Sequence, residues 1–94
     1  MLSFLDNPAF TSVISAVLTT RPEIALALEI FKTIVGKINL MSEDRKKAIM
    51  QMDRRLKFLF EELAKNNISK EYRKELEIRL HETLYHAILI AEEQ

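Results

Sequence analysis

The chain has 94 residues, and its 14 basic and 14 acidic side chains give a formal net charge of 0 at pH 7. The absence of Cys excludes a disulfide framework and thiolate metal ligands, while one Gly and two Pro are too few for a domain of many strands and turns. Helix-forming residues dominate and the balanced charge disfavours a strongly electrostatic nucleic-acid binder, so the composition predicts one small all-α domain over 1–94.

Residues 1–41 form an apolar half that carries only six of the 28 charged side chains, and we expect it to fold as a pair of helices. Pro8 suits the first turn of a helix, because its missing N–H has no helical partner there, and this predicts a first helix over 8–19. One side of this helix is apolar, and another side carries small hydroxyl residues.

A second helix is predicted over 22–40. Thr20 and Glu23 have the spacing of a capping box, in which the Thr20 hydroxyl accepts the backbone N–H of Glu23. The apolar arc of this helix is wider than one helix–helix contact can bury, so we expect the helix to pack over a larger apolar surface. The arc comprises Ile24, Leu28, Ile30, Phe31, Ile34, Val35, Ile38 and Met41.

Residues 42–94 form a charged half, which begins with a third helix predicted over 43–66. Ser42 is a suitable N-cap, because its hydroxyl can accept a backbone N–H of the first turn. Met50 and Phe58 lie off the apolar face of this helix, so both are candidate contacts for a partner. The apolar face itself repeats at spacings of three and four and comprises Ala48, Ile49, Met52, Leu56, Leu59, Phe60 and Leu63.

The last helix is predicted over 70–92, with Ser69 as its N-cap. The short link from the third helix predicts a long antiparallel hairpin. The main apolar face of the last helix, which we expect against the third helix, comprises Tyr72, Leu76, Leu80, Leu84, Ala87, Ile88 and Ala91.

A second apolar stripe on the last helix consists of Ile78, Tyr85 and Leu89, and it lies nearly opposite the main face. A helix that is apolar on two sides is usually buried on two sides. We therefore expect the stripe to be covered either by the first two helices or by a second copy of the chain, most simply in a two-fold dimer.

The sequence shows no motif for catalysis, cofactor binding or metal binding. His81 and His86 are five residues apart and diverge around a helix, whereas a helical metal pair needs a spacing of three or four. The only glycine, Gly36, lies inside a predicted helix, so no phosphate-binding loop is present. We therefore expect no cofactor, no metal and no enzymatic activity.

Two alternative functions stay open. Lys47, Arg54 and Lys57 make the third helix locally basic and can contact the phosphates of a nucleic acid, although acidic residues interrupt the patch. The first two helices can lie on a membrane surface, although the charges of the second disfavour a transmembrane span. The first residues carry no basic segment, which disfavours a secretory signal peptide, and the absence of Cys agrees with a cytoplasmic protein.

The leading hypothesis is a small non-enzymatic interaction module, acting as an adaptor, assembly factor or inhibitor by binding a partner protein. Self-association is expected as well, because the first two helices offer more apolar area than one helix face can hide. The identity of the partner does not follow from the sequence. The predicted contacts for a partner or a second copy are Met50, Phe58, Ile78, Tyr85 and Leu89.

Overall fold

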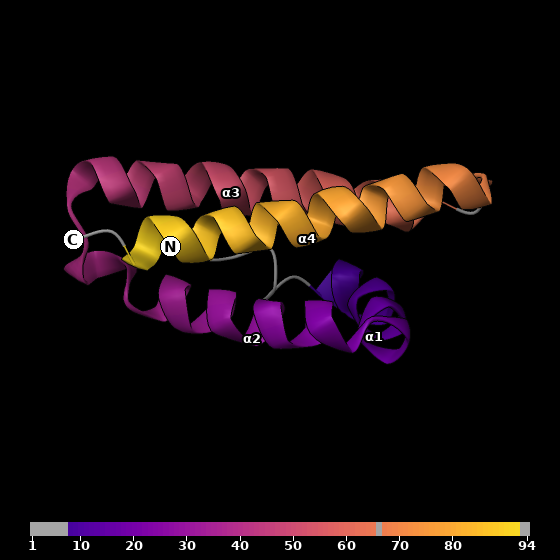
Figure 1. Ribbon diagram of the computed structural model, residues 1–94, viewed down its shortest axis with the longest axis horizontal. Helices are drawn as coiled ribbons and strands as arrows, with labels where there is room; N and C mark the ends of the chain where they lie inside the picture. The colour runs from indigo at the N-terminus through magenta and orange to yellow at the C-terminus, as the bar shows by residue number, and fades with distance from the viewer. Residues whose placement is uncertain (1–7, 66, 93–94) are drawn as a thin grey trace.

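The computed structural model describes residues 8–65 and 67–92, which form an all-α structure (Figure 1). A 3-10 turn, Pro8–Phe10, leads into the first α-helix, and another, Ile38–Leu40, lies between the second and the third. The predicted small helical bundle that ends in an antiparallel hairpin is confirmed. The helices are α1 (Thr11–Thr20), α2 (Pro22–Gly36), α3 (Glu43–Leu63) and α4 (Lys70–Glu92).

Helices α3 and α4 lie side by side over their whole length, and α2 packs along α4 (Figure 1). Helix α1 lies beneath the end of the hairpin where α3 and α4 are joined, so it closes that end of the bundle. Side chains from α2, α3 and α4 meet in one core between the three long helices. The residues with no exposed surface are Phe31, Ile49, Leu56, Phe60, Leu80, Leu84 and Ala87.

The periodicity of the charged half correctly predicted which faces of the hairpin are buried. Six of the seven residues assigned to the apolar face of α3 are buried, and the exception, Ala48, is half-buried. On α4 the centre of the predicted main face, Leu76, Leu80, Leu84 and Ala87, is buried against α3 and α2. The hairpin therefore has one inner face that the rest of the chain covers.

Two predicted helix caps, Ser42 and Ser69, are confirmed, whereas the predicted cap of the first helix, Asn7, lies outside the described residues. Ser42 Oγ accepts the backbone N–H of Arg45 at 3.3 Å, and Ser69 Oγ accepts that of Tyr72 at 3.1 Å. These bonds satisfy N–H groups that have no partner within the helix, and they fix where α3 and α4 begin.

The predicted capping box at Thr20 is wrong. Thr20 is the last residue of α1, and its hydroxyl donates to the carbonyl oxygens of Ala16 and Val17 at 3.2 and 3.3 Å. Arg21 occupies the N-cap of α2 without a side-chain hydrogen bond. A threonine hydroxyl can bond a preceding carbonyl as readily as a following N–H, and here it bonds the preceding helix.

Helices α2 and α3 end earlier than predicted. α2 stops at Gly36, because Lys37 leaves the helical conformation and the chain turns through Ile38–Leu40 toward α3. Gly36 lowers helix propensity at this point. α3 stops at Leu63 rather than at the predicted Asn66, a residue that lies outside the described part of the chain.

Candidate functional site

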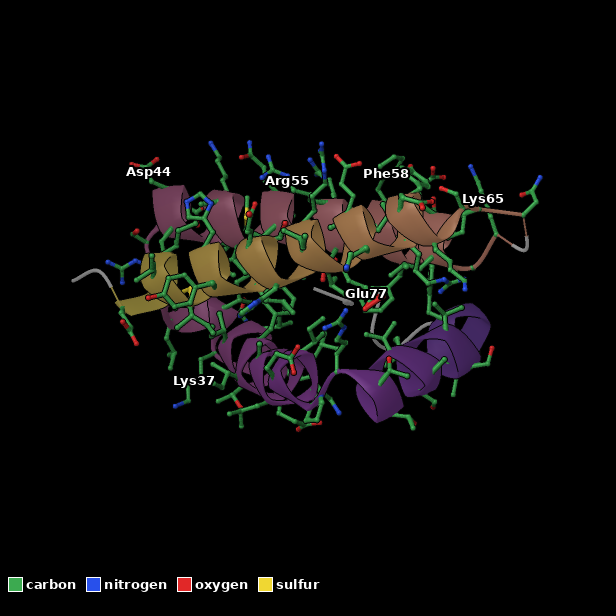
Figure 2. All side chains as sticks on the ribbon, turned by 45° about the vertical axis from the view of Figure 1, so that its right-hand side comes forward. Lys37, Asp44, Arg55, Phe58, Lys65 and Glu77 are labelled. Atoms are coloured by element: carbon green, nitrogen blue, oxygen red, sulfur yellow. The ribbon has the colours of Figure 1, made fainter. Side chains whose placement is uncertain are left out.

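The hairpin has a second side, opposite the core-facing side of α3 and α4, which we call the outer face. In Figure 2, Arg55 and Phe58 project from the hairpin on this side, whereas Glu77 points into the space between α4 and the first two helices. All residues of the outer face are exposed, and they repeat at spacings of three and four on the side of each helix opposite the core. They are Lys47, Gln51, Arg54, Phe58 and Glu61 on α3, Lys65 just after its end, and Glu71, Glu75, Ile78, Glu82, Tyr85, Leu89 and Glu92 on α4.

Four of the five predicted partner contacts are exposed, one on α3 and three on α4. Phe58 is 56% exposed on α3, and on α4 the exposed fractions of Ile78, Tyr85 and Leu89 are 54%, 58% and 43%. The fifth contact, Met50, is half-buried and packs against the core, so the structure does not place it with the other four.

Helices α1 and α2 do not cover the second apolar stripe of α4, although they are one of its two expected coverings. α2 packs on the buried face of α4 instead and reaches only the edge of the stripe. There Ile78 borders a small crevice together with Arg21 and Ile24. Of the two expected coverings of the stripe, only a contact with a second copy of the chain therefore remains.

A groove of about 530 Å³ runs between α3 and α4 on the outer face. The buried residues Leu59 and Thr83 form its floor, and Phe58 stands at its side. The Thr83 hydroxyl donates to the carbonyl oxygen of Arg79 at 2.7 Å, so it is already satisfied within α4. The rim is polar and consists of the charged residues Arg55, Arg79 and Glu82 together with His86.

Two polar clusters hold the hairpin and its neighbours in position. Glu62 of α3 accepts a hydrogen bond from Lys65 and another from the Tyr72 hydroxyl of α4, the latter at 2.8 Å. The Lys65 ammonium and then the Tyr72 hydroxyl lower the pKa of Glu62, because both stabilise its charged form. These contacts link the two helices of the hairpin near the turn between them.

The second cluster joins α4 to the junction of α1 and α2. Arg21 Nε lies 2.7 Å from Glu77 Oε2, and the Glu77 side chain is largely buried. The hydrogen bond to Glu77 raises the pKa of Arg21, because the carboxylate stabilises the charged guanidinium. Because it joins residues 56 positions apart, this pair sets where the first two helices meet the hairpin.

The three candidate phosphate contacts are exposed on α3. Lys47 and Arg54 belong to the outer face, whereas Lys57 lies about a quarter of a turn around the helix, 4.0 Å from Glu61. Glu61 and the acidic residues of α4 stand beside these cations. The face as a whole therefore carries mixed charge.

Within 8–65 and 67–92, no group of three or more His, Asp or Glu side chains is arranged to hold a metal ion. Both histidines are exposed on α4. In this part of the chain, no helix combines the length and the hydrophobicity that a membrane span requires. Apolar contact and charge pairing are what the outer face can provide.

Sequence reasoning missed several exposed residues outside the hairpin. Leu26 and Leu40 are 66% and 86% exposed, and Ile30, a member of the predicted apolar arc of the second helix, is 40% exposed. The excess width of that arc is a signal that part of it faces outward. The groove residues Arg55, Glu82 and His86 were also missed, because the register between α3 and α4 is needed to bring them together.

Comparison with known proteins assigns no family. No protein-family model, no curated protein and no solved structure matches this chain.

Proposed function

We propose that this chain is a non-enzymatic helical interaction module, an adaptor, assembly factor or inhibitor that binds a partner protein through the outer face of the α3–α4 hairpin. The observation that carries this proposal is the exposure of four large apolar side chains on one face. They are Phe58, Ile78, Tyr85 and Leu89.

The core does not need these four side chains. Leu56, Leu80 and Leu84 already fill the space between the long helices with no exposed surface. Scattered apolar residues are common on protein surfaces, but apolar groups gathered on one face and rimmed by charge are typical of interaction sites. Aromatic anchors such as Phe58 and Tyr85 would supply most of the binding energy, while the charged rim would set orientation and association rate.

Affinity capture from cells with tagged variants tests this proposal. Phe58→Ala and Leu89→Ala are expected to reduce capture of the partner at least about tenfold, since truncation of an interface anchor commonly costs about 2 kcal/mol or more. Leu26→Ala is the matched control, because Leu26 is also a large exposed apolar residue but lies on α2. This control is expected to capture as much partner as the unaltered chain.

Three outcomes would contradict the proposal. In the first, Phe58→Ala and Leu89→Ala capture the same proteins in the same amounts as the unaltered chain. In the second, Leu26→Ala is the variant that loses the partner. In the third, the captured material is a nucleic acid that nuclease treatment removes, which would favour phosphate contact by Lys47 and Arg54 instead.

A further inference from the structure

The charges of the outer face that belong to no ion pair within the described residues are divided between its two helices. On α3, Lys47 and Arg54 are exposed, and no ion pair of the described residues includes them. On α4, Glu71, Glu82 and Glu92 are exposed and likewise belong to no ion pair within the described residues. The outer face therefore presents a row of free cations beside a row of free carboxylates.

The apolar groups of the outer face follow the same division. Phe58 stands alone on α3, close to Arg54 and Arg55, whereas the stripe Ile78, Tyr85 and Leu89 is interrupted by carboxylates on α4. Each helix thus offers the charge and the apolar shape that the other helix lacks. A surface of this kind is complementary to itself.

We infer that the outer face binds a second copy of this chain, with α3 of each copy lying antiparallel on α4 of the other. The inference rests on the proposed function, because it names the partner of the same surface. The two copies are related by a two-fold axis that runs parallel to the hairpin, so both α3–α4 contacts of the dimer are identical.

The register of this contact follows from the symmetry. Rotation about an axis parallel to the helices leaves every residue at its own height along them. Phe58 and Glu82 border the same groove in one chain, so Phe58 of the second copy comes level with Glu82, beside Ile78. Arg54 of the second copy, one turn before its Phe58, comes within reach of Glu82 and the Tyr85 ring.

The ends of the helices agree with the same arrangement. Because α3 and α4 are antiparallel, Lys47 near the start of α3 is level with the end of α4, where Glu92 lies. The second copy's Lys47 therefore faces the carboxylate of Glu92. In this arrangement a cation of the second copy faces Glu82, in the middle of the row of carboxylates on α4, and another faces Glu92, at its end.

The other two-fold arrangement of the same faces is disfavoured by charge. An axis that crosses the helices would place α4 on α4 of the second copy. Glu82 would then lie close to its own counterpart, and the acidic start of each α4 would face Glu92 of the other. Like charges brought together in an interface repel strongly, so the charges select the arrangement of α3 on α4.

The size of the outer face suits a dimer that dissociates on dilution. Helices of 21 and 23 residues are each about 30 Å long, and two helix axes about 8–10 Å apart make a face roughly 20 Å wide. Each copy would therefore contribute on the order of 600 Å², which is near the lower limit for specific interfaces.

Sedimentation equilibrium of the full chain and of charge-reversal variants tests the inference. The unaltered chain is expected to dimerise as its concentration rises and to dimerise less in high salt, because the contacts are ionic and partly exposed. Glu82→Arg and Arg54→Glu are each expected to weaken dimerisation at least about tenfold, since each places two like-charge contacts in the dimer. Arg54 is chosen over Arg55 because Arg55 lines the groove with Glu82 in a single chain.

An equal mixture of the two variants provides the decisive measurement. In a mixed dimer, the two reversed side chains face each other at one contact and the unaltered Arg54 and Glu82 face each other at the other. Both contacts are then attractive, so dimerisation is expected to return to within about threefold of the unaltered chain.

Glu29→Arg is the matched control, because Glu29 is an exposed carboxylate on α2 outside every ion pair of the described residues. This substitution changes the net charge by the same amount as Glu82→Arg, but Glu29 lies away from the outer face. This control is expected to dimerise normally.

The inference is overturned if the unaltered chain stays monomeric from micromolar to near-millimolar concentration, if the two reversals leave dimerisation unchanged, or if their mixture stays as weak as either variant alone. A monomeric chain that still captures a partner through Phe58 and Leu89 would overturn this inference alone. Loss of both the dimer and the Phe58-dependent capture would overturn the proposed function as well.

Discussion

Phe60→Ala is expected to lower the free energy of unfolding by about 3–5 kcal/mol, whereas Phe58→Ala is expected to lower it by less than about 1 kcal/mol. The two residues are identical in type and stand two positions apart in α3. Phe60 has no exposed surface, so its truncation removes apolar contacts and leaves a cavity between the helices. Phe58 is more than half exposed on the outer face, so most of its ring is already in water.

Urea denaturation followed by circular dichroism measures both changes. Similar losses for the two variants would mean that Phe58 belongs to the core, and Phe58 would then no longer be available to a partner. A small loss of stability for Phe60→Ala would mean that α3 packs against the other helices through a face that does not contain Phe60. The pair thus tests the distinction between the inner and outer faces of the hairpin.

Phe31→Ala is expected to cost about 3–5 kcal/mol as well, because Phe31 is the fully buried centre of the contact that α2 makes with the hairpin. Ile30→Ala is the neighbouring control and is expected to cost less than about 1 kcal/mol, since Ile30 is 40% exposed. Thermal and urea denaturation of both variants provide the measurement.

Equal stability of Phe31→Ala and the unaltered chain would contradict the position of α2 in the bundle. Amide hydrogen exchange would locate the effect of the substitution. Faster exchange is expected first in α1 and α2, because they depend on this contact, while the hairpin keeps its own packing.

The faces of the hairpin could be predicted from sequence because period and composition agree there. Ile49, Leu56 and Phe60 recur at helical spacing among charged residues, so one rotation of the helix buries all of them. Ser42 and Ser69 mark the starts of α3 and α4 through local hydrogen bonds, which depend only on neighbouring residues. Such features require no knowledge of the tertiary structure.

The remaining features depend on contacts between distant segments. The Arg21–Glu77 pair joins residues 56 positions apart and had no local signal. Thr20 had two possible hydrogen-bond partners, and only the path of the chain between α1 and α2 decided between them. The groove at Phe58 needed the register of α3 against α4, and the exposure of the stripe on α4 needed the position of α2.

Thiol labelling tests directly whether the outer face is free in one chain and covered by a partner copy. The chain has no Cys, so Leu89→Cys and Leu26→Cys each introduce a single reporter, one on the outer face and one on α2. In dilute solution both thiols are expected to react quickly. At high concentration the reaction of Leu89→Cys is expected to slow markedly while that of Leu26→Cys keeps its rate. The opposite pattern, or equal rates throughout, would mean that no partner copy covers the outer face.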